Sequence, residues 1–147
     1  MKQQLRYIWM KFVETYDYRD IGYQKLFHHQ NWRVAVLNYI DELEIDQIQY
    51  VEAHNLTDEA FVLLEGECHL IFAEVHDGKI NDISCINMKK HVVYKIPQGI
   101  YHTHTLSKDA HILIIEEENT GYDNSPRIYL SEEEKKHMMK RFEEVKK

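Results

Sequence analysis

Residues 52–66 read EAHNLTDEAFVLLEG, and residues 97–102 read PQGIYH. Both stretches combine segments typical of β-strands with a turn marked by glycine, Gly66 or Gly99. Imidazole and carboxylate side chains lie next to these turns in both stretches. A small β-barrel builds a divalent metal site by bringing such groups together from separate strands. The two stretches therefore indicate an all-β fold with a metal site.

The composition is that of an ordinary globular domain. The 147 residues fit one domain, and the ten Tyr, five Phe and two Trp exclude disorder as the dominant state. The 18 basic and 25 acidic residues give a formal charge of −7, and no stripe rich in Lys or Arg occurs. Because a phosphate backbone attracts basic surfaces, we expect no nucleic-acid partner.

Location is predicted from what the sequence lacks. It has no run of about eighteen apolar residues, so we expect no membrane association. The N-terminal residues form neither the apolar stretch nor the cleavage site of a secretory signal. Cys68 and Cys85 lie in apolar strand-like segments without CxxC spacing, which predicts buried, reduced thiols. Together these features predict a cytoplasmic protein.

Short strand-like segments recur from Trp32 onward. They cover residues 34–40, 47–54, 60–64, 68–75, 80–86, 92–96, 101–106 and 110–116. Asp77-Gly78 is the strongest hairpin signal, and Glu65-Gly66 predicts a second hairpin leading into residues 68–75. Strands this dense, without helical segments between them, predict a sandwich or barrel.

The C-terminal segment predicts a helix. Ser131 is followed by three glutamates that form a capping box, and Met138, Phe142 and Val145 recur at helical spacing. We therefore divide the chain into three parts. Residues 1–31 form an extension that packs on the barrel or on a partner, residues 32–118 form the barrel, and residues 119–147 form a connecting segment and the helix.

Four residues are candidate metal ligands. Glu52 and His54 are two apart on a predicted strand and therefore point to the same face. Glu59 follows a polar, turn-like insert and returns on an adjacent strand, and His102 comes from a separate strand after the Pro-x-Gly turn. Two imidazoles and two carboxylates suit a divalent transition metal, namely Mn, Fe, Co, Ni or Zn.

The spacing H-x4-E-x6-G from His54, followed by P-x-G-x2-H ending at His102, resembles the two motifs of the cupin superfamily. The resemblance covers roughly residues 34–118. It implies a double-stranded β-helix, or jelly-roll, barrel that binds a divalent metal, with His54, Glu59 and His102 matching three of the family's ligands.

Two residues depart from that pattern or add to it. Glu52 stands where the family has its first histidine, so it is a metal ligand, a general base or a placeholder without a role. His104 is two residues after His102 and should face the same way, as an extra ligand, a hydrogen-bond donor or a proton shuttle. We predict Glu52 and His104 as the residues that move protons. The run Glu116-Glu117-Glu118 is interpreted as a solvated strand end.

The resemblance implies a metal-dependent enzyme acting on a small polar metabolite, a sugar or a hydroxy or keto acid. An isomerase, epimerase, lyase or dioxygenase would fit. One alternative is a non-catalytic cupin that binds or senses a small molecule, with or without a metal, and a weaker one is a metal-free scaffold. Whether the protein is an enzyme stays open. A homodimer is expected under each interpretation, because apolar faces at both ends need cover.

Overall fold

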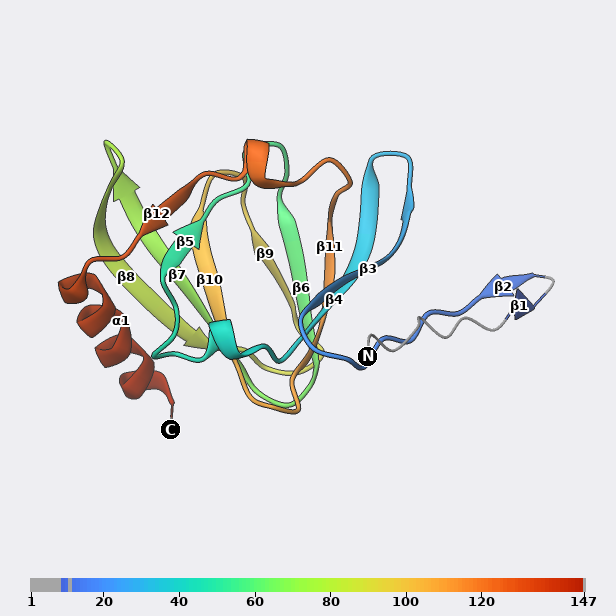
Figure 1. Ribbon diagram of the computed structural model, residues 1–147, viewed down its shortest axis with the longest axis horizontal. Coiled ribbons are helices and arrows are strands. Elements are labelled where there is room, and N and C mark those ends of the chain that lie inside the picture. The colour runs from blue at the N-terminus through green and yellow to red at the C-terminus, as the bar shows by residue number, and fades with distance from the viewer. Residues whose placement is uncertain (1–8, 11, 147) are drawn as a thin grey trace.

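The computed structural model describes residues 9, 10 and 12–146 and contains two five-stranded antiparallel sheets (Figure 1). The first sheet has the strand order β3-β4-β11-β6-β9. Its strands are β3 (Tyr23–His29), β4 (Trp32–Asn38), β11 (His111–Glu117), β6 (Glu59–Glu65) and β9 (Val93–Ile96). The prediction of an all-β fold is confirmed.

The second sheet has the strand order β12-β5-β10-β7-β8. Its strands are β12 (Arg127–Tyr129), β5 (Tyr50–Glu52), β10 (Tyr101–Leu106), β7 (Cys68–His76) and β8 (Lys79–Asn87). Two short 3-10 turns, η1 (Asp41–Leu43) and η2 (Tyr122–Asn124), lie in the connections. A separate hairpin of β1 (Trp9–Met10) and β2 (Val13–Glu14) projects away from both sheets (Figure 1).

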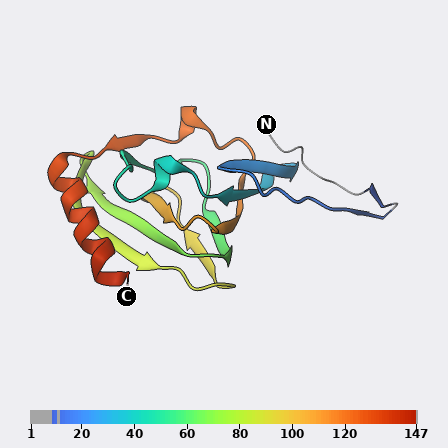
Figure 2. The same ribbon diagram turned by 60° about the horizontal axis from the view of Figure 1, so that its bottom comes forward.

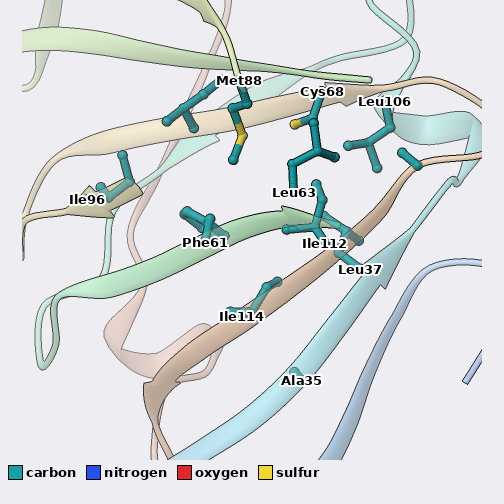
Figure 3. Packing of buried hydrophobic residues seen from close by; sticks show 12 residues of the cluster. Ala35, Leu37, Phe61, Leu63, Cys68, Met88, Ile96, Leu106, Ile112 and Ile114 are labelled. Atoms are coloured by element: carbon teal, nitrogen blue, oxygen red, sulfur yellow. The ribbon is translucent and has the colours of Figure 1, made fainter. Parts of the chain in front are cut away.

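The two sheets face each other across an apolar core (Figure 3). Phe61 and Ile112 from the first sheet pack with Leu70 and Leu106 from the second, and all four are buried. Alternation along each strand sends these residues inward. The inward-facing positions on β6 and β10 therefore include Glu59 and His102 as well, at the same interior as the core.

The outer face of the second sheet is covered by α1 (Glu132–Val145) (Figures 1 and 2). Met138 of α1 is buried against Ile71, Ile83 and Val51 of the sheet. Ser131 accepts a hydrogen bond from Glu134 N, and the Glu134 side chain bonds back to Ser131 N, so the predicted capping box is present. Within the described range, no helix has the length and apolar character needed to cross a membrane.

The predicted turns differ in outcome. Asp77-Gly78 joins β7 and β8 as a hairpin, with positive φ at both residues, as expected. The hairpin predicted at Glu65-Gly66 is wrong, because β6 pairs with β11 and β9 whereas β7 pairs with β10 and β8. Gly66 instead turns the chain from one sheet to the other with φ +72°, close against the backbone of Ala110.

Both sheets include strands outside residues 32–118. β3 pairs with β4 before that range begins, and β12 pairs with β5 after it ends. A register shift between Lys25 and Phe27 interrupts the alternation of β3, and β12 is too short to show a period. Residues 1–8 and 11 of the expected extension lie outside the described residues.

Both cysteines are free and buried, as predicted. Cys68 packs in the core between the sheets, whereas Cys85 packs in the cluster beneath α1. The two thiols therefore lie on opposite faces of the second sheet. Burial raises the pKa of the Cys85 thiol to about 11 and also raises that of Cys68.

Candidate metal centre

His102 is positioned by the turn that precedes β10. Pro97 O accepts a hydrogen bond from Ile100 N at 3.2 Å, and Gly99 has φ +83°, which is the geometry of a type II turn. Gly99 N donates to His54 O at 2.9 Å, so the turn is joined directly to the other histidine segment. The ring of His102 is held by a 2.9 Å hydrogen bond between Nδ1 and Ile100 O. Because a carbonyl oxygen only accepts, Nδ1 carries the hydrogen and Nε2 of the neutral ring is left with a lone pair.

His54 is positioned by the segment before β12. Ala53 N donates to Pro126 O at 3.1 Å and Asn55 N donates to Asn124 O at 2.9 Å, so the two segments run side by side. The Nδ1 atom of His54 lies 2.8 Å from the hydroxyl oxygen of Ser125. As with His102, a hydrogen bond at Nδ1 turns Nε2 toward the interior. Outer partners of this kind are typical of histidines that bind metals.

Glu59 brings the two rings together. Its Oε2 atom lies 2.7 Å from His54 Nε2 and 3.2 Å from His102 Nε2. One ligand atom from each of these three buried residues lies within 4.8 Å of the other two. The predicted residues His54, Glu59 and His102 are therefore brought together at one point, from the segment after β5, the start of β6 and the start of β10.

The chemistry of the three groups fits a metal ion. Oε2 of Glu59 is buried without a conventional hydrogen-bond partner, although both Nε2 atoms point at it. A neutral imidazole that carries its hydrogen on Nδ1 presents a lone pair at Nε2, and this lone pair and those of Oε2 repel each other. Only protons or a cation between these atoms make the cluster favourable. Two imidazoles and one carboxylate with open positions is a set that divalent transition metals accept.

The electrostatics of the cluster favour a charged carboxylate. Burial raises the pKa of Glu59, but the adjacent imidazoles of His102 and His54, when they carry a proton toward Oε2, outweigh burial and hold that pKa well below its usual range. Burial lowers the pKa of His54, yet Glu59 reverses the effect and raises it above the ordinary value. The carboxylate is therefore anionic at neutral pH, as metal binding requires.

Glu52, the fourth predicted ligand, does not belong to the group formed by His54, Glu59 and His102 in the described part of the chain. It faces the same side of its sheet as His102, because the two residues are directly opposite each other on β5 and β10. Its Oε2 atom instead accepts a hydrogen bond from Arg127 Nε at 3.2 Å. The structure thus pairs Glu52 with a cation from β12.

His104 is buried beside the cluster without belonging to it. Its ring packs edge-on against Phe61 at 4.4 Å between centroids, and its centroid is 6.0 Å from that of His102. Burial, together with the charge of His102, lowers the pKa of His104 to about 3. The Nε2 atom of His104 is buried with no hydrogen-bond partner among the described residues.

The expectation that Glu116 belongs to a solvated strand end is wrong. Glu116 is buried, and its Oε1 atom accepts hydrogen bonds from Arg33 Nη2 at 2.7 Å and from Tyr23 OH at 2.9 Å. Burial and the nearby charge of Glu59 raise the pKa of Glu116, and Arg33 opposes them. Glu116 is register-paired with Arg33, and this pairing could not be read from a run of three glutamates.

The fold of the chain is similar to that of solved protein structures, although its sequence is not similar to known families. No family model matches the chain, and no curated protein sequence matches it. The solved structures of Fe(II) HppE and of CapF with the inhibitor 3-isopropenyl-tropolone both align with a TM-score of 0.52. They are 13% and 15% identical and cover 79% and 75% of this chain. The alignments span 58% of the HppE chain and 33% of the CapF chain.

A cupin-2 domain protein from Shewanella frigidimarina NCIMB 400 aligns with a TM-score of 0.48 and 19% identity, over 68% of this chain and 84% of its own. The described residues form two facing antiparallel sheets with a buried His-Glu-His group inside, and this group could hold a metal ion. The chain has the cupin fold.

Proposed function

We propose that the protein is a metal-dependent enzyme that acts on a small polar metabolite, with the metal held by His54, Glu59 and His102. The convergence of two histidine Nε2 atoms on the orphaned Oε2 of Glu59 carries the proposal. Fe(II) in HppE, an aligned protein of the same fold, supports Fe(II) as one candidate beside Mn, Co, Ni and Zn.

A divalent metal at this group would supply Lewis-acid chemistry, by polarising a carbonyl or hydroxyl oxygen of the substrate. The chain's own residues orient the site. Ser125 and Ile100 O hold the two imidazoles at Nδ1, and Phe61 packs against the ring of His102 at 5.9 Å between centroids. The apolar core beside the cluster keeps water away from it, which strengthens electrostatic interactions within the cluster.

The reaction fits an isomerase, epimerase, lyase or dioxygenase, since three protein ligands leave positions for a substrate with two oxygens. Of the two predicted proton carriers, His104 stays neutral because its lowered pKa disfavours the imidazolium. A neutral His104 is suited to accept a hydrogen bond from a ligand bound beside His102, and its lowered pKa argues against the predicted role of moving a proton.

Elemental analysis of the purified protein tests the metal. We expect close to one divalent metal per chain after loading with Mn, Fe, Co, Ni or Zn and removal of excess metal. The variant His102→Ala should lose it. His76→Ala is the matched control, because His76 is exposed at the β7–β8 hairpin, next to Glu74 and far along the strand from the cluster. Metal retained in full by His102→Ala would overturn the site assignment.

A non-catalytic binding or sensing protein is the alternative, and the pairing of Glu52 supports it. The Glu52 carboxylate is engaged by Arg127 rather than left free to face a substrate. Thermal-shift screening with recovery of the stabilising metabolite separates the two functions. Consumption of the metabolite supports the enzyme, whereas its recovery unchanged supports binding.

The proposal includes a cytoplasmic homodimer. Ile115 of β11 and Val93 of β9 are 43% and 68% exposed on the face of the first sheet that points away from the core. An apolar face of this kind is suited to a second copy. Light scattering across micromolar concentrations tests it, and a monomer throughout would contradict it.

A further inference from the structure

Arg127 lies on the same face as the candidate metal centre. Arg127 is directly opposite Glu52 in the pairing of β12 with β5, and Ser125 contacts His54 two residues along. Residues two apart on neighbouring extended segments point to the same side. The pair Glu52–Arg127 is therefore adjacent, on one face, to the pair His54–Ser125.

Arg127 is also related to His102 across the sheet, through Glu52. Glu52 is opposite Arg127 on one side and opposite His102 on the other, so the three form one row across β12, β5 and β10. Neighbouring strands lie about 4.8 Å apart, which places β12 about 10 Å from β10. A small ligand of about that length would match the distance along the row from the metal cluster to the guanidinium.

The guanidinium of Arg127 contacts two aromatic rings and one carboxylate. Its Cζ atom lies 4.1 Å from the centroid of the Tyr50 ring and 4.5 Å from that of the exposed Tyr122. Its Nε donates to Glu52 Oε2 at 3.2 Å. The hydrogen bond to Glu52 comes from Nε. The outer edge of the guanidinium, formed by Nη1 and Nη2, does not take part in that bond. Two rings and one carboxylate thus fix the plane of a planar, forked donor.

We infer that Arg127 binds a carboxylate group of the substrate, which makes the substrate class a small organic acid rather than a neutral sugar. The inference rests on the metal site proposed above. A guanidinium fork matches a carboxylate with two parallel hydrogen bonds, and fixing its plane beforehand lowers the entropic cost of binding. A divalent metal with only Glu59 as anionic ligand leaves the cluster cationic, so both ends of the row attract an acid.

Glu52 then acts as a positioning residue. It orients Arg127 through Nε, and its negative charge also weakens the attraction for an acid. Replacing Glu52 by Gln keeps a hydrogen-bond acceptor for Nε and removes the charge. Glu52→Gln should therefore bind an acid more tightly than the wild type, an effect that a merely structural role for Glu52 does not produce.

Calorimetric titration of the Mn-loaded protein tests the inference. The probes are succinate, malate and 2-oxoglutarate, with succinamide as the uncharged control. We expect at least one acid to bind and succinamide not to bind. Loss of a charge-assisted bidentate contact should weaken that acid by about tenfold or more in Arg127→Ala, and by less in Arg127→Lys. Arg141→Ala is the control, since Arg141 of α1 bonds Glu144 and Ile83 O on the outer face.

Metal content measured on the same samples separates the two proposals. If the metal is bound but no acid binds, or if the acid binds Arg127→Ala as well as the wild type, the role of Arg127 is refuted and the metal site stands. If no metal is bound but an acid still binds in an Arg127-dependent way, the metal-dependent function fails and the carboxylate site stands. Absence of both metal and acid binding overturns both.

Discussion

Replacing Arg33 by Met should cost more stability than any surface substitution in the first sheet. Arg33 and Glu116 form an ion pair at 2.7 Å, with side chains only 15% and 3% exposed. Arg33 Nε also donates to Glu116 Oε1 at 3.0 Å, and its terminal nitrogens donate to the carbonyl oxygens of Glu118 and Thr120. Methionine removes all four hydrogen bonds and preserves the apolar stem.

The loss of unfolding free energy in Arg33→Met depends on the Glu116 carboxylate that remains without its cation. The substitution leaves a buried carboxylate with Tyr23 as its remaining neutral donor and with the charge of Glu59 nearby. Removing one partner of a buried pair costs about 3–5 kcal/mol of unfolding free energy. Because the pKa of Glu116 is already raised, partial protonation should place the result near the lower end of that range.

Urea unfolding of the metal-free protein measures the effect. Lys25→Met is the matched control, because its ion pair with Glu118 at 2.6 Å is 40% exposed on the lysine side and should contribute about 0–1 kcal/mol. The double variant Arg33→Met/Glu116→Leu should be more stable than Arg33→Met alone, since no buried charge is left. A loss of less than about 1 kcal/mol in Arg33→Met would refute the reasoning.

Three further outcomes are expected. Metal at 100 times its Kd should raise the unfolding free energy by about 2.7 kcal/mol in the wild type and not in His102→Ala, measured by thermal or urea unfolding. Gly66→Ala should be more destabilising than Gly78→Ala, because both have positive φ but only at Gly66 would a Cβ lie 2.6 Å from the backbone of Ala110. In thiol labelling of the native protein, Cys68 and Cys85 should stay unreactive at pH 8, since burial raises both pKa values, and should react after unfolding.

Each outcome has a counterpart that would contradict it. Equal stabilisation of wild type and His102→Ala by metal would place the metal elsewhere. Equal losses in the two glycine variants would show that the approach to Ala110 is not a constraint. Rapid labelling of both thiols in the native protein at pH 8 would contradict their burial.

The fold could be predicted from local patterns where one strand has one exposed and one buried face. Asp77-Gly78 specified its hairpin because a two-residue turn with positive φ depends on those residues alone. Glu65-Gly66 looks similar in sequence, yet it connects two sheets, because strand partners are chosen by distant segments. The strands β3 and β12 were not predicted. A bulge interrupts the alternation of β3, and β12 is too short to show a period.

Part of the candidate site could likewise be predicted from the sequence, and part of it could not. Spacing indicated that Glu52, His54, Glu59 and His102 would converge, and the structure brings the last three together. The partner of Glu52 could not be predicted, because Arg127 comes from a segment expected to be a connection. Ser125 and Tyr122 lie in that same segment, and a lone serine or tyrosine carries no signal of its role.

Crystals of the protein soaked in Mn²⁺ and measured for anomalous scattering test the metal centre most directly. We expect one strong peak per chain within about 2.0–2.3 Å of His54 Nε2, Glu59 Oε2 and His102 Nε2. Glu52 should remain paired with Arg127 and outside the coordination sphere. A peak bound by other residues, or none at this group after soaking, would contradict a metal centre formed by His54, Glu59 and His102.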